Sequence, residues 1–313
     1  MSTATPVTTT PPAIVTTGEK LSIAGRARSR LSSSTSTVAA IVIAVLWTIP
    51  TFGLFLSSFR PEDKIKTTGW WTWFFGDFEL TLQNYQDVLF GETGNLADFF
   101  VNSIVITVPA VLFSIFFAAL AAYGMSWMRW RGRDWVFIGV FALQIVPLQM
   151  ALVPMLKIFS SWPGFSSLDP QGTGKFITIW VAHVCFGLPL CIFLLHNFMS
   201  DLPTELMEAA RVDGADHARI FRSIVLPLIV PALASLAIFQ FLWIWNDLLV
   251  GLVFGTTETK PLTAALGDLA GTRGNEWQRL TAGAFVSIVV PLIVFLSLQR
   301  YFVRGLLAGG LKG

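Results

Sequence analysis

Residues able to do chemistry fall in two places in this 313-residue chain. One is a charged segment, 201–222, and the other is a set of polar side chains inside long apolar runs. The segment holds Asp201, Glu205, Glu208, Arg211, Asp213, Asp216, Arg219 and Arg222. The polar residues are Asn102, Gln144, Gln149, His183, Gln240, Asn246 and Asp247. Charges on a helix suit docking to another protein, whereas polar groups among apolar ones join helices or line a path.

These groups are not arranged as an enzyme site. His183, His196 and His217 are scattered and lack the spacing of a metal-binding motif. No paired carboxylates or GxSxG sequence lie inside an apolar run, and no phosphate-binding GxxxxGK[ST] loop is present. Cys185 and Cys191 stand ~9 Å apart if their run is helical, too far for a disulfide. We therefore predict no catalytic residue, no metal and no cofactor on this chain.

The composition indicates an integral membrane protein. Hydrophobic residues make up 54% of the chain and charged residues only 13%, with a mean hydropathy of +0.66. Soluble chains usually carry about a quarter charged residues. A net charge of +2 without a basic patch argues against a nucleic-acid partner.

Apolar runs long enough to cross a bilayer predict an all-α membrane protein with six transmembrane helices. The expected spans are 38–59, 99–125, 135–156, 176–199, 224–255 and 280–299. Residues 1–36 are rich in Ser, Thr and Pro and predict a flexible tail, which leaves 37–313 as one six-helix domain. The first run is too long for the core of a signal peptide and lacks a cleavage site.

The basic residues predict the orientation. With the N-terminus inside, 13 of the 21 lysines and arginines fall on the inner side, and every short inner loop is rich in arginine. Both termini and the segment 200–223 are thus expected to be cytoplasmic.

The charged segment reads as two helices separated by a glycine. The first helix is expected from Leu202 or Pro203 to Asp213, because proline suits a first turn. Gly214 can end it in the left-handed conformation, and Asp216 can cap the next helix. The pair is either a solvated connector or a docking element. The interruption of the charges by Ala209, Ala210 and other apolar residues favours docking.

The spacing within this segment resembles the EAA motif of bacterial ABC importer permeases. Glu208, Ala209 and Ala210 are followed by Asp213 and Gly214, and then by Ile224, Leu226 and Pro227. The sequences LQNY at 82–85, NS at 102–103 and WND at 245–247 are similar to the carbohydrate, maltose-type branch. The C-terminal sequence 298–313 is similar to the shorter, six-span permease of that branch. The resemblance covers about residues 38–313.

This resemblance implies a type I ABC importer permease in the bacterial inner membrane. The EAA helix would be a coupling helix in a cleft of a separate ATPase dimer, which binds the ATP and Mg. Glu208 would be the charged contact, Ala209 and Ala210 the close-packing face, and Gly214 the turn. The implied partners are a second, different permease, an extracytoplasmic sugar-binding protein, the sugar and membrane lipid. The function implied is import of an oligosaccharide or glucoside by alternating access.

The candidate substrate path lies mainly in the fifth span. Sugars are bound by amides or carboxylates together with aromatic faces. The candidates are Gln144, Gln149, Gln240, Trp243, Trp245, Asn246 and Asp247. Such residues also join neighbouring helices, so packing is the alternative role for each. For Asp247 a structural or gating pair is favoured over sugar contact.

The sequence allows two interpretations of the loop 256–279 and two of the transport mechanism. The loop 256–279 corresponds in position to an outer loop that enters the binding protein in maltose-type permeases, or it is a plain connector. The alternative function is a secondary, ion-coupled transporter, which would show inverted repeats and ionisable residues near the midplane. Asp247 is the only internal acidic residue, and no repeat is evident.

Overall fold

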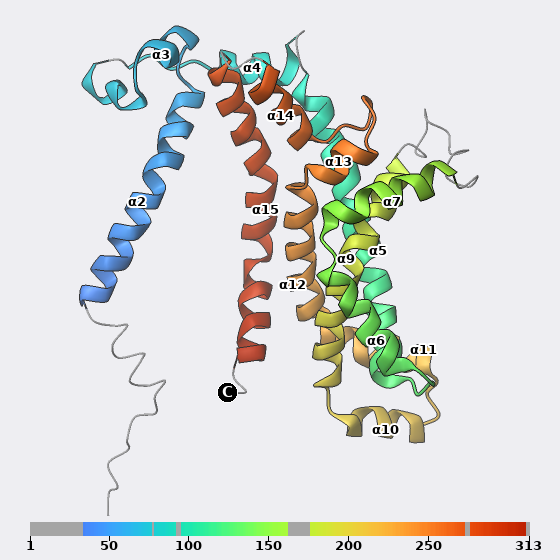
Figure 1. Ribbon diagram of the computed structural model, residues 1–313. Helices are drawn as coiled ribbons and strands as arrows, with labels where there is room; N and C mark the ends of the chain where they lie inside the picture. The colour runs from blue at the N-terminus through green and yellow to red at the C-terminus, as the bar shows by residue number, and fades with distance from the viewer. Residues whose placement is uncertain (1–33, 77, 92–94, 162–175, 273–275, 311–313) are drawn as a thin grey trace, which may run out of the picture. The chain divides into compact units, whose positions relative to one another are not determined.

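The computed structural model describes residues 34–76, 78–91, 95–161, 176–272 and 276–310, and every regular element in these ranges is a helix (Figure 1). The tail predicted over 1–36 lies outside the described residues up to residue 33. The chain divides into two compact units, Met1–Gly53 and Leu54–Gly313. Helix α2 (Ser34–Ser58) forms the described part of the first unit and ends in the second.

Within the described ranges, five helical stretches are long and apolar enough to cross a membrane. They are Ser36–Ser58 in α2, Leu96–Trp127 (α5), Ile177–Ser200 (α9), His217–Trp245, and Trp277–Gln299 in α15 (Trp277–Gly310). A bent pair of helices, Arg133–Ile145 and Leu148–Ser161, supplies a sixth stretch. The all-α architecture expected from the sequence is therefore present.

The third expected span, 135–156, is not one continuous helix. Helix α6 (Arg133–Ala142) and the 3-10 turn η2 (Leu143–Ile145) meet α7 (Leu148–Ser161) at a bend of 107°. Pro147 has no N–H to donate and disfavours a helical conformation at the residue before it. Val146 accordingly has φ −74° and ψ 119°, which is extended backbone.

The fifth expected span, 224–255, has different ends. The helical stretch begins earlier, with α11 (His217–Ile220) and the π-helical turn η4 (Phe221–Val225), and continues as α12 (Leu226–Trp245). It stops at Trp245, and a separate short helix, α13 (Leu249–Phe254), follows. Hydropathy alone does not register this break because the residues on both sides of it are apolar.

The segment 256–279, expected as a loop, is largely helical. Helix α14 (Leu262–Thr272) occupies its centre, and Leu262, Ala264 and Ala265 are buried. The N–H of Leu262 donates to Oγ of Ser103 over 2.8 Å, and Asn102 donates to the carbonyls of Glu258 and Lys260. Residues 273–275 of this segment lie outside the described part of the chain.

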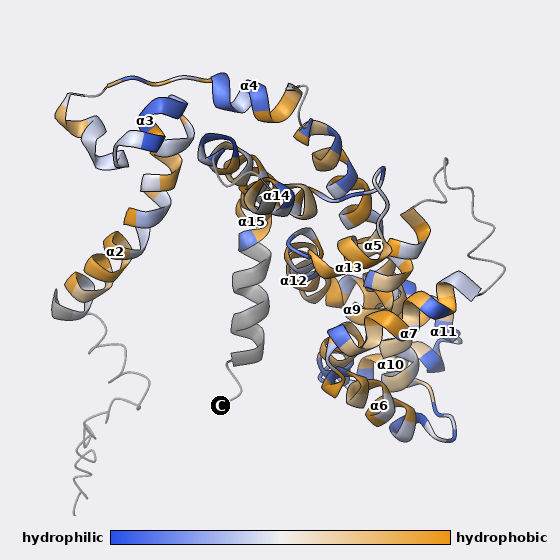
Figure 2. Cartoon of the chain, turned by 45° about the horizontal axis from the view of Figure 1, so that its top comes forward, coloured by the Kyte–Doolittle hydropathy of each residue, from blue (hydrophilic) through white to orange (hydrophobic). Residues whose placement is uncertain are grey.

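The core of the second unit forms around α5, α9 and α12. One buried cluster joins these helices to α13 and α14, and another joins them to α10 (Thr204–Val212), α11 and η4. Small residues such as Ala118, Ala122 and Cys191 let α5 and α9 approach closely. Figure 2 shows hydrophobic residues along α7, α9 and α13, as expected for helices that face other helices or lipid.

Short helices follow α2 at the other end of the second unit from α10. They are α3 (Glu62–Thr67), the 3-10 helix η1 (Trp70–Phe75) and α4 (Gln83–Phe90). The buried amide of Asn84 donates to the carbonyls of Ser58 and Arg60 at 2.9 and 2.8 Å, so α4 is fastened to the end of α2. The hydroxyl of Tyr85 bonds Ser58 at 2.7 Å, and burial raises the pKa of Tyr85.

Candidate functional site

The charged segment folds as two helices with a glycine between them, as its sequence predicts. Helix α10 runs across the end of α9 (Figure 1), and Gly214, two residues after its last residue, has φ +78°. The N–H of Ala215 bonds the carbonyl of Ala210 at 2.9 Å, and the N–H of Gly214 bonds that of Arg211 at 3.0 Å. This pair of bonds is the Schellman ending of a helix, which requires a left-handed residue at the position of Gly214.

The second helix begins at the expected cap. The carboxylate of Asp216 accepts a hydrogen bond of 2.8 Å from the N–H of Arg219, in the first turn of α11. This bond satisfies one of the unpaired N–H groups at the start of the helix. The chain then passes through η4 into α12, so the charged segment continues directly into a membrane-spanning helix.

The two faces of α10 have different roles. Met207 and Ala210 stand one turn apart and are buried against the second core cluster. Leu206, Ala209 and Val212 are exposed; Val212 is 87% exposed and Leu206 44%. The carboxylates of Glu205 and Glu208 are also exposed. An exposed face with both apolar and acidic side chains suits docking in a groove of another protein.

The expectation that Ala210 forms part of this docking face is wrong. The side chain of Ala210 is only 7% exposed and packs against this chain's own core. With 3.6 residues per turn, Ala210 shares the face of Met207, while Ala209 lies on the face of Leu206 and Val212. The sequence alone did not show which of the two alanines points inward.

The remaining residues of the motif have structural positions. Asp213 is the exposed C-cap residue that directly follows α10. Ile224 lies in η4, and Leu226 and Pro227 form the first turn of α12, where the missing N–H of proline is tolerated. These residues determine how the charged segment enters the span.

Contacts that no sequence pattern indicates fasten the segment to α5. The hydroxyl of Tyr123 lies 3.0 Å from Nδ1 of His217, and its ring is 5.1 Å from that of Phe221. Arg211 donates a hydrogen bond of 3.4 Å to the carbonyl of Trp127. A polar tyrosine near the end of an apolar span was the available signal, but its partner stands 94 residues away.

Two of the candidate path residues, Gln240 and Trp245, are buried within the chain. Gln240 is 2% exposed and accepts a weak hydrogen bond from Sγ of Cys191 at 3.6 Å. Its amide nitrogen lies so close to Gly187 that a Cβ there would be 2.0 Å away. The indole of Trp245 donates to the carbonyl of Ser287 at 3.0 Å. The structure places both residues in helix packing, the alternative left open by the sequence.

The end of α12 contains a compact polar group. The Asp247 carboxylate accepts hydrogen bonds from the N–H groups of Val250 and Gly251, at 2.9 and 3.3 Å. Nε2 of His183 lies 3.6 Å from the same carboxylate, just beyond hydrogen-bond distance. The ring of Trp243 meets that of His183 edge-on at 6.2 Å.

The other candidate path residues are exposed. The amide of the exposed Asn246 donates to the carbonyl of Leu242 at 2.7 Å and ends α12. Gln144 and Gln149 are exposed on either side of Pro147, at the bend between η2 and α7. The structure thus brings His183, Trp243 and Asp247 together and leaves Gln144 and Gln149 at the bend.

The fold and these contacts can be compared with known proteins. The family model described as "Binding-protein-dependent transport system inner membrane component" matches residues 100–307. The chain belongs to this family. The matched range, 100–307, includes the whole charged segment with α10, α11 and η4, and it includes the polar group at the end of α12.

Named relatives match nearly the whole chain. The chain is 49% identical to an osmoprotective compounds uptake permease of Synechocystis, over 88% of this chain and 91% of that one. It is 37% identical to an alpha-glucoside transport system permease of Rhizobium meliloti, over 87% of this chain and 95% of that one. A bacterial ABC transporter for alginate import has the same fold, with a TM-score of 0.66 at 24% identity over 86% of this chain and 98% of that one.

The family assigns this permease its class of activity. It is a multi-pass inner-membrane subunit of an ABC importer that depends on a binding protein, and ATP hydrolysis takes place on separate ATPase subunits. None of these matches supports the alternative of an ion-coupled secondary transporter.

Proposed function

We propose that the exposed face of α10 is the surface through which the ATPase subunits drive this permease. The observation that supports the proposal is the way α10 is held. One face is buried, its C-terminal end is closed by Gly214, and the next helix leads straight into α12. A push on α10 therefore acts on a packed helix rather than on a flexible loop. Glu208 would supply the charged contact, and Ala209, with Leu206 and Val212, the close apolar surface.

The cargo we propose is a glucoside or an oligosaccharide. This proposal rests on relatives named for alpha-glucosides and, at 32% identity, for arabinooligosaccharides. The relative at 49% identity is named for osmoprotective compounds, which makes such a compound the second candidate cargo. On this proposal Gln144, Gln149, Trp243 and Asn246 contact cargo as the permease changes state. Gln240, Trp245 and Asp247 would hold the helices that carry them.

The assembly we propose contains a second, different permease, a dimer of ATPase subunits and an extracytoplasmic binding protein. ATP and Mg would be bound by the ATPase subunits, and this chain would bind no cofactor. Both termini and α10 would face the cytoplasm, as the arginine-rich inner loops predict. The binding protein would deliver cargo to the opposite, outward-open side.

The test is reconstitution of the whole transporter with its binding protein. Uptake and ATP hydrolysis are measured with alpha-glucosides, arabinooligosaccharides and osmoprotective compounds. We expect at least one cargo class to stimulate both activities. Stimulation only by an ion gradient, without ATP consumption, would refute the proposal.

The role of Glu208 is tested in the same preparation. Glu208→Lys should weaken binding of the ATPase subunits or uncouple hydrolysis from uptake, because it reverses the charge of the docking face. Glu79→Lys is the matched control, since Glu79 is an exposed carboxylate that lies outside α10 and its docking face. Unchanged assembly and coupling in Glu208→Lys, or equal losses in both variants, would argue against a specific contact by Glu208.

A further inference from the structure

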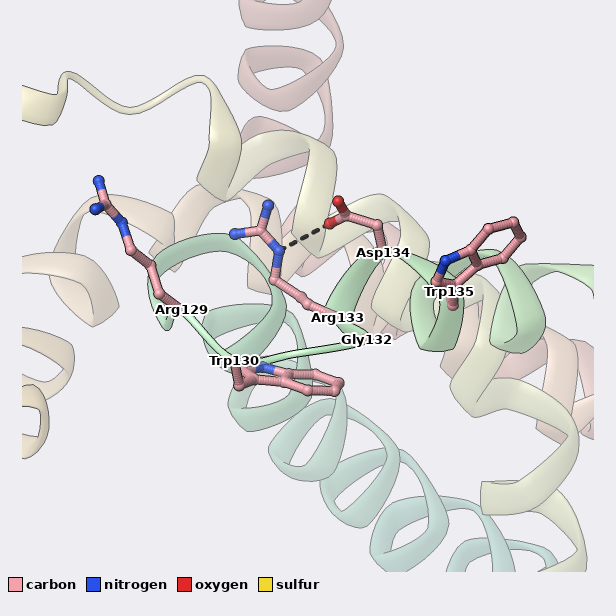
Figure 3. Close-up of a pocket in the computed structure, with 6 residues that line it drawn as sticks. All are labelled: Arg129, Trp130, Gly132, Arg133, Asp134 and Trp135. Atoms are coloured by element: carbon pink, nitrogen blue, oxygen red, sulfur yellow. Dashed lines mark hydrogen bonds and ion pairs between the residues drawn. The ribbon is translucent and has the colours of Figure 1, made fainter.

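A pocket lies in the turn between α5 and α6, separate from the docking face of α10. Its volume is about 530 Å³, and it is lined by Arg129, Trp130, Gly132, Arg133, Asp134 and Trp135 (Figure 3). None of these residues contributes to the proposed cargo path or to the contacts between α10 and the core.

The pocket is positively charged. Arg129, Arg131 and Arg133 occupy alternate positions, and Asp134 is the one acidic residue of the turn. Asp134 pairs with Nε of Arg133 at 2.9 Å, which leaves the two terminal nitrogens of that guanidinium facing outward. Figure 3 shows the guanidinium groups of Arg129 and Arg133 rising from the same side of the turn. Arg129 forms no ion pair with any residue in the described ranges. Guanidinium groups suit the oxygens of a phosphate, and two of them line this pocket.

The aromatic residues place this charge at the membrane surface. The membrane-spanning helix α5 ends at Trp127, only two residues before Arg129. The indole of Trp130 donates to the carbonyl of Gly124 at 3.2 Å, which holds its ring at the end of that helix. Trp135 is 80% exposed in the first turn of α6. Tryptophans prefer the depth of lipid headgroups, so the arginines beside them are expected at that depth as well.

The exposed apolar side chains of α6 favour a lipid over a soluble partner as the ligand of this pocket. Val136 and Ile138 follow Trp135 and are both exposed, as expected for a helix that faces acyl chains. The pocket therefore borders an exposed apolar surface on one side and a basic turn on the other. A protein partner would have to cover the apolar side chains of α6 as well as the arginines.

We propose that this pocket binds the headgroup phosphate of an anionic phospholipid. Arg129 and Arg133 contact the phosphate, and the rings of Trp130 and Trp135 lie against the glycerol region. The net positive charge of the turn selects anionic over zwitterionic headgroups, because a zwitterion adds a repelled cation. The proposal does not depend on which compound the permease carries.

The test uses the assembled transporter in nanodiscs of phosphatidylcholine with and without phosphatidylglycerol. Native mass spectrometry counts the phosphatidylglycerol molecules that stay bound. The double variant Arg129→Gln with Arg133→Gln should weaken this retention by ~25-fold, since one basic side chain near an anionic surface contributes roughly fivefold. The matched control, Arg219→Gln with Arg222→Gln, removes the same charge at the same end of the bundle and should leave retention unchanged.

Further measurements distinguish a bound lipid headgroup from free phosphate and from a protein partner. Trp135→Ala should weaken retention of the lipid while the transporter still assembles. Equal retention of phosphatidylcholine, or equal losses in the two double variants, would overturn the proposal. Displacement of the bound phosphatidylglycerol by inorganic phosphate would also overturn the proposal, because the site would then bind free phosphate rather than a lipid. An unchanged lipid count with weaker binding of the ATPase subunits would assign the arginines to a protein interface and would also overturn it.

Discussion

The hydroxyl of Tyr123 on α5 lies 3.0 Å from Nδ1 of His217 and 3.2 Å from the carbonyl of the same residue. A hydroxyl has one hydrogen to donate and can also accept. Tyr123 therefore can donate to the carbonyl while it accepts from the ring. His217 is the first residue of α11, so this contact joins the end of a span to the helix that follows α10.

Replacement of Tyr123 by phenylalanine tests this connection. Tyr123→Phe keeps the ring contact with Phe221 and removes both hydroxyl contacts with His217, each of which contributes about 1 kcal/mol. We expect faster amide hydrogen exchange in 217–222 and a lower ratio of transport to ATP hydrolysis. Both are measured in the reconstituted transporter.

Tyr85→Phe is the control for the loss of a tyrosine hydroxyl. It removes the 2.7 Å contact with Ser58 at the other end of the unit. That variant should lower stability by a similar amount and leave exchange in 217–222 unchanged. Equal exchange in Tyr123→Phe and the natural permease would rule out the role assigned to Tyr123.

Substitution of Gly214 tests whether the left-handed turn after α10 is needed for assembly. Its φ of +78° is a left-handed conformation, and a side chain there costs about 1–2 kcal/mol. No atom lies within 4 Å of a Cβ built at this position, so the cost comes from the backbone alone. Gly214→Ala should weaken assembly with the ATPase subunits, and Gly214→Asn should do so less.

Gly267→Ala is the matched control for Gly214→Ala. It lies inside α14, where a Cβ likewise meets nothing, and alanine favours a helix by roughly 1 kcal/mol. Gly267→Ala should therefore raise the unfolding temperature while Gly214→Ala lowers it. Shifts of the same sign in both variants would contradict the conformational explanation.

The role of Asp247 can be divided between its hydrogen bonds and its charge. Asp247→Ala removes the acceptor for the N–H groups of Val250 and Gly251, and a lost cap costs about 1 kcal/mol. Asp247→Asn keeps an acceptor oxygen and should retain most of the protection of α13 in hydrogen exchange. If both variants expose α13 equally, the contact with His183 matters more than the cap does.

The contact between Gly187 and Gln240 predicts a compensating pair of substitutions. Gly187→Ala places a Cβ 2.0 Å from the Gln240 amide nitrogen, and overpacking of this kind costs about 1–3 kcal/mol. Thermal unfolding should show the loss, and Gln240→Ala in the same chain should reverse most of it. Gly124→Ala is the control, because its Cβ would meet Met128 at an ordinary 3.8 Å. A double variant no more stable than Gly187→Ala alone would refute the packing role.

Much of the docking element follows from local sequence. Gly214 and Asp216 mark the end of one helix and the start of the next, because capping depends on residues within one turn. The resemblance around Glu208 likewise identifies the family. The bend at Pro147 is also a local effect, but the apolar run on both sides of it predicts a single span when only hydropathy is considered.

The sequence by itself determined the class of protein, its helical fold and the position of α10, since hydropathy and capping act over a few residues. Only the tertiary structure decided that Ala210 faces inward while Ala209 faces outward, because that depends on where α9 and α12 leave room. The contacts of Tyr123 with His217 and of Cys191 with Gln240 join residues 94 and 49 positions apart. Pairs at such separations are formed by helix packing, and no pattern within either segment specifies its partner.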